Sequence, residues 1–506
     1  MHEAGTWVLL ESAVADLPAD LRWLFESGAI TLAQLAAAHN TLGITSIADI
    51  AAAVREQQFR QIEGFDAAIE AAVADALPTI RAAIPRIPLG RATSIVEPLL
   101  ARVRSSAGVD WAEPVGSLRR GEDSVGDIEI VGSTRNAPAA IDAVLTMPGI
   151  VRTLHRSENR AYFVHEGVQV GVRFPNPATA GAALLHLTGT RAHFAALQAH
   201  AASRGLRLTT AGMFKASGAL LPSDTEQIVY AELGLPFIAP EIRNGDEEVG
   251  AALGGALPAL VSRGDVRGDL HMHSTWSDGR DSVAVMVETC RALGYEYMAI
   301  TDHSPHSAAT RNLSVDDVER QAEEIAGLRE RYPDIAILHG CEADILEDGR
   351  IDFPDRVLER FDIVLASLHD RAGHDAGQLL KRYAAAMHHP LVNMITHPTN
   401  RMVPHRPGYD LDYARLFDIA AASDTFLEID GAPGHLDLDG TLARRAIAAG
   451  ASVAIDSDCH RAEMLDRQMN LGVITARRGW VEPRHVVNTL PLADLRGRIA
   501  RKRSGR

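Results

Sequence analysis

Apolar runs that end in polar side chains recur along the second half of the chain. Each run has the length of a buried strand, and stretches long enough for a helix separate the runs, such as residues 282–293 and 438–449. The seven runs are Leu270, 297–303, 335–342, 363–369, 391–397, 425–430 and 452–458. Strands that alternate with helices predict a parallel sheet closed into a barrel, in which the residues after each strand gather at one rim.

The first half of the chain follows other patterns. Residues 1–88 are rich in alanine and carry apolar positions at helical spacing, which predicts a small helical region. Residues 89–240 contain a Gly-Ser turn that runs into an apolar strand, and the Gly/Ala-rich segment 241–265 is typical of a linker. We therefore expect an α/β multidomain protein with its barrel at 266–490 and a basic tail, 491–506, of the kind that is usually disordered.

Composition narrows the function. A formal charge of −16 and a pI near 5.7 exclude the global positive field of a tight, non-specific DNA binder, so any contact with nucleic acid must be local. The three cysteines, at positions 290, 341 and 459, show no pairing pattern, which indicates a reducing compartment. No apolar stretch approaches about 18 uncharged residues, and no signal-peptide pattern is present. We expect a cytoplasmic protein with no membrane partner.

The polar residues at the strand ends are of types that bind metals. A single histidine is more often an ordinary hydrogen-bonded residue than a ligand, but imidazoles and carboxylates at the ends of seven strands favour a metal site. This mixture suits zinc, manganese or iron rather than calcium, and the lack of cysteine pairs argues against a structural zinc site. We expect a catalytic site that holds several ions.

Residues 264–490 resemble the PHP (polymerase and histidinol phosphatase) superfamily, whose fold is a distorted (β/α)7 barrel. The resemblance rests on motifs such as Gly268–Asp278 and Asp458-Cys-His460. It implies nine metal ligands: His271, His273, Asp278, His303, Glu342, His369, His397, Asp458 and His460. It also implies three divalent ions, Mn2+, Zn2+ or Fe2+, which would promote hydrolysis of phosphate esters.

By the same resemblance, the ligands divide among the three ions. The first set is His271, His273 and Asp458; the second is Asp278, His303 and His460; the third is His369 and His397, with Glu342 bridging two ions. The expected catalytic residues are Glu342, Asp458 and His460.

Five further residues lie near these strand ends. Arg371, Arg401 and Arg406 follow ligand-bearing strands and can pair either with substrate phosphates or with surface acids. Asp302 and Asp456 can orient ligand histidines or, equally well, cap loops.

A second motif, residues 115–131, precedes the barrel. It is a Gly-Ser turn with paired arginines, Arg119 and Arg120, followed by an apolar strand on which Asp127 and Glu129 point to one face. Two adjacent carboxylates can hold a magnesium ion, while the turn and an arginine can cradle a triphosphate. The candidate nucleotide-binding residues are Gly116, Ser117, Arg120, Asp127 and Glu129.

Residues 90–240 resemble the palm and thumb of family X DNA polymerases, in the nucleotidyltransferase superfamily. With the barrel behind them, the architecture is similar to bacterial family X polymerases that carry a C-terminal PHP domain. That family uses three aspartates for synthesis, and this chain keeps Asp127, has Glu129 at the second position and Gly171 at the third. The neighbouring Arg173 offers no substitute carboxylate, so we expect DNA synthesis to be absent or residual.

By position, the helical region 1–88 matches the helix-hairpin-helix region of that family, which grips the DNA backbone through Gly-x-Gly turns. In this chain Gly64-Phe-Asp66 has an aspartate in place of the second glycine, which weakens such a grip. We therefore expect plain packing helices there.

These observations favour a metal-dependent 3′-5′ exonuclease that acts on DNA ends in repair, with a polymerase-like core retained for DNA or nucleotide binding. The expected partner is DNA with 3′ ends in gapped or recessed duplexes, alongside other repair proteins. Two alternatives stay open: an active repair polymerase with a PHP exonuclease, and a small-molecule phosphatase of the histidinol-phosphatase type. A DNA-end binding protein without catalysis is a fourth reading, which the full ligand set disfavours.

Overall fold

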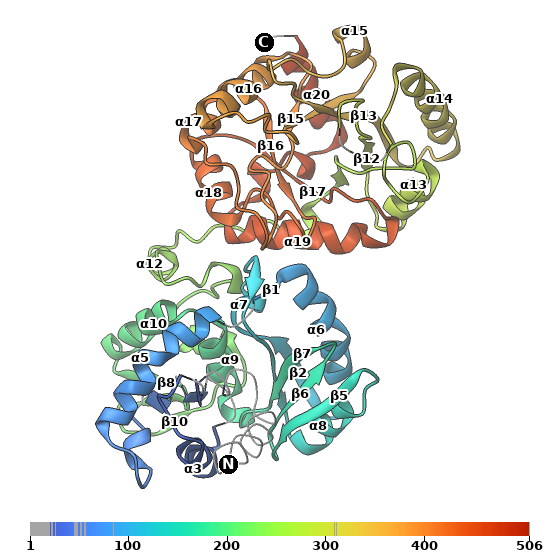
Figure 1. The fold of residues 1–506 in the computed structure, drawn as a ribbon. Helices are drawn as coiled ribbons and strands as arrows, with labels where there is room; N and C mark the ends of the chain where they lie inside the picture. The colour runs from blue at the N-terminus through green and yellow to red at the C-terminus, as the bar shows by residue number, and fades with distance from the viewer. Residues whose placement is uncertain are drawn as a thin grey trace, which may run out of the picture. The chain divides into compact units, whose positions relative to one another are not determined.

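The computed structural model describes residues 21, 24–25, 27–44, 49–50, 53–54, 57–83, 86–307, 309 and 311–504. The chain divides into two compact units (Figure 1). The first comprises Met1–Ile87, Arg91–Arg119 and Ser124–Phe237, and the second comprises Pro88–Gly90, Arg120–Asp123 and Ile238–Arg506. Residues 1–20 of the expected helical region lie outside the described residues.

The described N-terminal residues form helices α3 (Leu32–Leu42) and α5 (Ala67–Ala83) with the short η1 (Phe59–Gln61). Thr31 and Gln34 make a capping box at the start of α3, and Gly43 ends it in the left-handed conformation. At the start of α5, one carboxylate oxygen of Asp66 accepts hydrogen bonds from the amides of Ala68 and Ile69. This aspartate therefore occupies the amides that a phosphate would need.

The palm-like part of the first unit is a five-stranded sheet in the order β2-β4-β7-β6-β5. Among the strand pairs of this sheet that the structure describes, only β4 and β7 are parallel, and their register places Glu129 opposite Gly171. The strands are β2 (Val109–Pro114), β4 (Ile128–Thr134), β5 (Ile150–Arg156), β6 (Arg160–His165) and β7 (Val168–Arg173). The helices with them are α6 (Leu89–Arg104), α7 (Gly116–Arg119) and α8 (Ala137–Leu145).

A smaller subdomain follows the palm-like sheet. Its three-stranded sheet has the order β10-β9-β8. A separate two-stranded sheet, made of β1 and β3, comes from an earlier part of the chain. The strands are β1 (Ile87–Pro88), β3 (Ser124–Val125), β8 (Leu206–Thr209), β9 (Gly212–Lys215) and β10 (Leu220–Leu221). The helices are α9 (Ala180–Thr188), α10 (Arg191–Ser203) and α11 (Glu226–Glu232).

The second unit contains the predicted barrel, and the mixed α/β fold class is confirmed. Seven parallel strands pair in chain order from β11 to β17, and a bridge between Met272 and Cys459 joins the segments that directly follow the first and the last strand. The strands are β11 (Gly268–Asp269), β12 (Tyr297–Ile300), β13 (Ala336–Asp344), β14 (Ile363–Ser367), β15 (Met394–Ile395), β16 (Phe426–Asp430) and β17 (Val453–Asp456).

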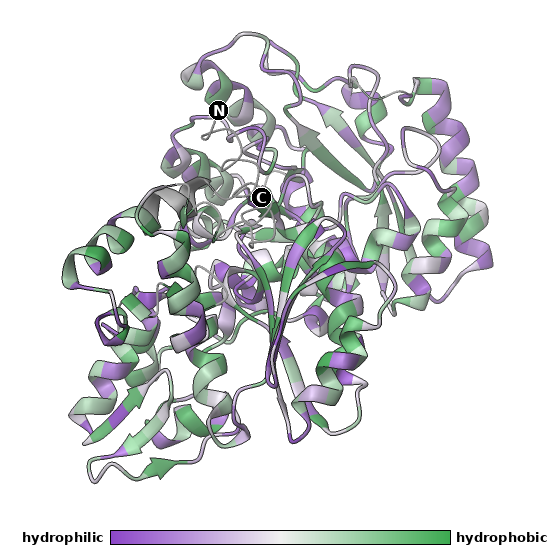
Figure 2. Cartoon of the chain, turned by 60° about the horizontal axis from the view of Figure 1, so that its bottom comes forward, coloured by the Kyte–Doolittle hydropathy of each residue, from purple (hydrophilic) through white to green (hydrophobic). Residues whose placement is uncertain are grey.

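Alternation along the strands separates two cores. Tyr297 and Ala299 belong to the cluster that fills the barrel, whereas Met298 and Ile300 pack in the layer that includes the surrounding helices. The strands are largely hydrophobic, and the helices around them carry both hydrophobic and hydrophilic residues (Figure 2). These helices are α13 (Val283–Ala292), α14 (Val315–Arg331), α15 (Asp355–Leu358), α16 (Ala376–His388), α17 (Tyr413–Ala422), α18 (Gly440–Ala448) and α19 (Leu465–Arg478).

The expectation of a disordered basic tail was wrong. Residues Leu492–Arg503 form helix α20, in which Leu495 and Ile499 are buried in the cluster that fills the barrel. The ammonium group of Lys502 donates hydrogen bonds to the carbonyl oxygens of Met387 and Ser423, both at 2.8 Å. Most of the tail therefore forms a helix, and its buried side chains pack in the core of the barrel.

The segment 241–265 also contains regular structure, namely helix α12 (Glu248–Leu253) and the short η3 (Pro240–Ile242) and η4 (Arg263–Asp265). Arg243, in this segment, is fully buried. Among the described residues, no helix combines the length and the apolar character needed to cross a membrane.

Candidate metal centre

The nine expected ligands come together at the carboxyl-terminal ends of the barrel strands. His271 and His273 follow β11, and Glu342 lies near the end of β13. Asp278 lies in the loop after β11. The remaining ligands follow the other strands: His303 after β12, His369 after β14, His397 after β15, and Asp458 and His460 after β17. This convergence was expected because parallel strands deliver the residues that follow them to one rim.

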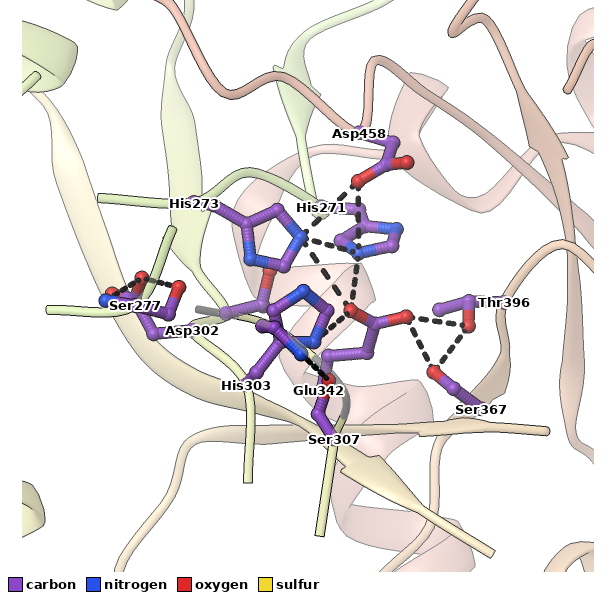
Figure 3. Close-up of polar contacts among 12 residues, drawn as sticks. His271, His273, Ser277, Asp302, His303, Ser307, Glu342, Ser367, Thr396 and Asp458 are labelled. Atoms are coloured by element: carbon purple, nitrogen blue, oxygen red, sulfur yellow. Dashed lines mark hydrogen bonds and ion pairs between the residues drawn. The ribbon is translucent and has the colours of Figure 1, made fainter. Parts of the chain in front are cut away.

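The innermost group contains His271, His273, Glu342 and Asp458. The Nε2 atoms of the two histidines lie 3.1 Å apart, and Nε2 of His273 is 3.1 Å from Oδ1 of Asp458. Oε2 of Glu342 is 3.4 Å from Nε2 of His271 and 3.5 Å from Nε2 of His273 (Figure 3). All of these side chains are buried.

The tautomer of His271 shows that this group fits a cation. Nδ1 of His271 lies 2.6 Å from Oε1 of Glu428, so in its neutral form the ring donates its one proton there and turns the lone pair of Nε2 inward. That lone pair faces another imidazole nitrogen and two carboxylate oxygens. Electron pairs that converge in a buried site are a cation's ligand set, which fits the expected metal chemistry.

A second group lies nearer the solvent. Oδ1 of Asp278 is 3.2 Å from Nε2 of His460 and 3.6 Å from Nε2 of His303. The donor atoms of these three residues and His273 all lie within 4.8 Å of one another. The side chains of His460 and Asp278 are 36% and 25% exposed, so this side of the centre is open to a substrate.

Glu342 joins the third group to the others. Its Oε1 is 2.9 Å from Nε2 of His397 and 3.5 Å from Nε2 of His369, while its Oε2 is 2.9 Å from Nδ1 of His303. Thr396 donates a hydrogen bond to Oε1 at 3.1 Å, which helps to fix the carboxylate. The position of Glu342 between the histidine groups suits the bridging role that the resemblance implies.

The charges of the centre are strongly coupled. Burial alone would raise the pKa of Glu342, but His303, His271 and His369 outweigh it and hold that pKa well below its usual value. Burial alone would lower the pKa of His271, but Glu428, Glu342 and Asp458 raise it well above its usual value. Without metal, a proton on His271 is therefore favoured and offsets part of the negative charge of the buried carboxylates.

Two acids that orient ligand histidines were missed in the sequence. Glu428, fully buried on β16, holds His271 and accepts a hydrogen bond from the backbone amide of His397 at 2.6 Å. Oδ1 of Asp344, on β13, is 3.0 Å from Nδ1 of His369. Their signal was a carboxylate within an otherwise apolar strand, where burial demands a polar partner.

Asp302 and Asp456 were the expected candidates for that orienting role, and the structure gives them another one. Asp302 accepts hydrogen bonds from the amides of Ser274 and Ser277, so it caps the loop after β11. Asp456 accepts one from the amide of Leu270 at 2.7 Å. Both acids tie loops and strand ends together, so the loop-cap alternative holds for them.

Two ligand residues adopt a backbone conformation that side chains rarely take. His397 has φ +27° and Asp458 has φ +46°, in or near the left-handed region. For a residue other than glycine such a conformation costs on the order of 1–3 kcal/mol and persists where surrounding structure holds it. The surrounding structure of the barrel therefore holds His397 and Asp458 in a strained backbone conformation at the metal centre.

The three arginines considered for substrate phosphates already have partners. The guanidinium group of Arg401 donates to the carbonyl oxygen of His435 at 2.9 Å and to Asp123 at 2.7 Å. Arg406 donates to the carbonyl oxygen of Asn400 at 3.1 Å, and Arg371 donates to that of His374 at 2.8 Å. Their role in phosphate binding stays a prediction.

The palm-like sheet places an arginine beside its remaining carboxylates. Nε of Arg173 donates to Glu129 at 2.9 Å, and the same guanidinium lies 3.2 Å from Asp49. Burial raises the pKa of Glu129, with Asp127 and Asp49 adding to it and Arg173 opposing it. The carboxylate of Glu129 is therefore paired with an internal cation.

The third aspartate position has no room for a side chain. A Cβ atom built on Gly171 would lie 2.7 Å from the ring of Tyr162 and 3.2 Å from Cγ of Glu129. Of the turn residues, Gly116 begins α7 with φ +63° ahead of Ser117, and Arg120 forms an ion pair with Glu122.

Comparison with known proteins gives matches to both halves of the chain. A family model described as DNA polymerase beta thumb matches residues 183–244, and one described as PHP domain matches residues 269–429. The chain is 32% identical to the DNA polymerase/3'-5' exonuclease PolX of Bacillus subtilis (strain 168) over 504 residues, which covers 99% of this chain and 88% of the relative.

Shorter matches connect the chain with phosphatases. It is 31% identical over 211 residues to a probable phosphatase of Caldanaerobacter subterraneus, which covers 38% of this chain and 75% of that protein. It is 30% identical over 207 residues to a probable phosphatase of Syntrophotalea carbinolica, covering 38% of this chain and 80% of that protein.

Proposed function

Because the chain belongs to the PolX family of bacterial DNA polymerase/3'-5' exonucleases, we propose that its barrel removes nucleotides from the 3′ ends of DNA during repair. The chain is an enzyme, a metal-dependent hydrolase of phosphate esters. The observation that carries the proposal is the gathering of nine histidine and carboxylate donors at one mouth of the barrel, with one side open to solvent.

We propose that three divalent ions bind at this centre, with manganese as the activating metal rather than zinc or iron(II). His271, His273 and Asp458 would hold one, Asp278, His303 and His460 another, His369 and His397 a third, and Glu342 would bridge. When bound, such a cluster lowers the pKa of water and stabilises the negative charge that develops on phosphate oxygens.

The protein's own residues prepare the centre for that chemistry. Glu428 and Asp344 fix the tautomers of His271 and His369, so that one nitrogen of each ring stays available as a ligand. The exposed edges of His460 and Asp278 mark the side from which a phosphodiester enters. His460 and Asp458, with Glu342, are the residues we assign to catalysis at that opening.

We propose that the polymerase-like part holds DNA and does not extend it. The match to a polymerase thumb favours DNA as a partner, in gapped or recessed duplexes. The pairing of Glu129 with Arg173, and the crowding at Gly171, leave a magnesium ion in the palm without the carboxylates it needs for synthesis. Gly116, Ser117, Arg120 and Asp127 remain candidates for binding a nucleotide or a DNA phosphate.

We further propose the domain limits 1–88, 89–240, 241–265, 266–490 and 491–506, with the last segment packed on the barrel. A cytoplasmic location is supported by the three cysteines, which are buried and unpaired. Other repair proteins are further candidate partners.

The proposal is tested by degradation of a labelled duplex with a recessed 3′ end, in the presence of manganese. The wild type should shorten the strand from its 3′ end, and a His271→Ala, His273→Ala double variant should not. The matched control is His389→Gln, because this histidine is partly buried but pairs with Asp355 away from the centre. Normal degradation by the double variant would contradict the site assignment.

The second candidate function is a small-molecule phosphatase. The matches to probable phosphatases favour it, because they are about as long as the barrel alone. Turnover of sugar or amino-alcohol phosphates that exceeds turnover of the duplex would support this reading. Templated incorporation that Asp127→Ala abolishes would instead support the active polymerase.

A further inference from the structure

A fourth group of metal-binding side chains adjoins the centre and lies mostly outside the nine expected ligands. One oxygen of Asp430, one oxygen of Asp458 and one ring nitrogen of His435 all lie within 4.8 Å of one another. Asp430 ends strand β16, and His435 lies in the loop that follows. Only Asp458 belongs to the nine, so this group shares one residue with the centre.

The carboxylate of Asp430 has an unused oxygen. The residue is fully buried, and its Oδ1 accepts a hydrogen bond from the amide of Ala432 at 2.6 Å. Its Oδ2 is buried and has no hydrogen-bond partner among the described residues. Leaving a buried acceptor unpaired costs about 1–3 kcal/mol, and a cation shared with Asp458 would remove that cost.

The ring of His435 is held in place beside this carboxylate. It stacks on the ring of His397, with centroids 5.4 Å apart, and its buried Nδ1 also lacks a hydrogen-bond partner among the described residues. Two backbone hydrogen bonds between Asp430 and Asp437, at 2.6 and 3.2 Å, close the loop that carries it. Ring and carboxylate are therefore positioned by the fold and not by each other.

We propose that Asp430, His435 and Asp458 form a fourth divalent-cation site that binds a phosphate oxygen of the substrate. Two carboxylates and one imidazole suit zinc, manganese or iron(II). Three protein ligands leave a coordination position open, as in catalytic sites, and an oxyanion can fill it. The inference rests on the proposed function, because Asp458 also belongs to the main centre.

A proton shared between Asp430 and Asp458 is the competing explanation, since two close carboxylates raise the pKa of one of them. The two explanations predict different numbers of metal ions bound per chain. Asparagine at position 430 keeps the size of the side chain and removes a charged ligand. It should therefore lower the number of bound ions only if a cation binds there.

The test compares full-length proteins loaded with zinc, desalted and analysed by mass spectrometry for metal per chain. Asp430→Asn and His435→Gln should each lose one equivalent relative to the wild type, while His389→Gln should lose none. Metal content equal to that of the wild type in both variants overturns the site and supports the shared proton. Loss of the whole cluster by well-folded variants also overturns it, because the site would not be separate.

Because either variant can misfold, a zinc titration of the wild type provides a second measurement. The wild type should bind one equivalent of zinc more than the main centre holds. This extra equivalent is measured by comparing two variants: the triple variant His271→Ala, His273→Ala, Asp430→Asn should bind one zinc ion fewer than the double variant His271→Ala, His273→Ala. No further loss contradicts the fourth site alone. A wild type that binds no zinc contradicts the proposed function as well, so the two failures are distinguishable.

Discussion

Replacing Glu428 with glutamine is expected to weaken metal binding without changing any ligand. Both oxygens of Glu428 are occupied: Oε1 lies 2.6 Å from Nδ1 of His271, and Oε2 accepts from the amide of His397 at 2.6 Å. Glutamine offers one acceptor and one amide donor. Whichever way it turns, one of the two N–H groups meets another donor in a fully buried place.

The magnitude follows from that lost hydrogen bond. A hydrogen bond to a charged group contributes about 1.5–3 kcal/mol, and each 1.4 kcal/mol is a factor of about ten in affinity. Loss of a residue that orients a metal-binding histidine costs about 10–100-fold in metal affinity, which agrees. The Glu428→Gln variant should therefore bind metal about 10–100-fold more weakly and lose its exonuclease activity at limiting metal.

The assay is competition with a chelator of known affinity, combined with strand degradation at limiting and at saturating manganese. Saturating metal should restore much of the activity. The matched control is Asp456→Asn on the neighbouring strand, since Asp456 is equally buried and lies opposite Asp430 in the register. Burial, Asp269 and Glu428 raise the pKa of Asp456 well above its usual value, which favours the neutral form that asparagine resembles.

Metal affinity of Glu428→Gln equal to that of the wild type, in a variant that melts normally, would contradict the orienting role of Glu428. Equal weakening by Asp456→Asn would also refute it. In that case any buried acid of this layer would matter, and the contact with His271 would have no special role.

Three further predictions concern charge, packing and the palm. Burial lowers the pKa of His369, but Glu342 and Asp344 raise it to about 10. The contribution of this histidine to the stability of the metal-free fold is therefore complete below about pH 6.5 and is lost as the pH rises towards 10. Metal-free protein should melt at a lower temperature at pH 9.5 than at pH 6.5, and the reverse order would contradict this. Leu495→Ala should lower the free energy of unfolding by about 2–5 kcal/mol, because the side chain is fully buried, whereas Leu253→Ala, at a position 57% exposed, should change it little. Equal effects in urea unfolding would show that α20 adds nothing to the barrel. Gly171→Asp should lower stability by about 1–3 kcal/mol and restore no primer extension, because the added Cβ would lie 2.7 Å from a tyrosine ring; robust extension by this variant would contradict the account of the palm.

The barrel and the gathering of its donors could be predicted from the sequence because both follow from periodicity. A buried parallel strand reads as a short apolar run, and the residue after it must lie at the common rim. His303 and His397 lie within three residues of the ends of β12 and β15, so their positions at the rim could be predicted without any contact being known. Residues that follow successive parallel strands in the sequence therefore lie close together in the fold.

Roles that depend on distance between particular atoms could not be predicted in this way. Glu428 and Asp430 stand in an apolar strand, but only coordinates show that one holds His271 and that the other has an unused oxygen. The amphipathic spacing of Leu495 and Ile499 was present in the tail, and the surrounding arginines obscured it. The many charged residues of the tail favoured exposure to solvent, whereas its apolar positions at helical spacing determined how the helix packs.

The most direct test of the central claim is anomalous scattering from a crystal of the wild type grown with manganese. Strong peaks are expected at the mouth of the barrel, among His271, His273, Asp278, Glu342 and Asp458. A well-ordered barrel with these side chains in place and no anomalous peak between them would contradict it.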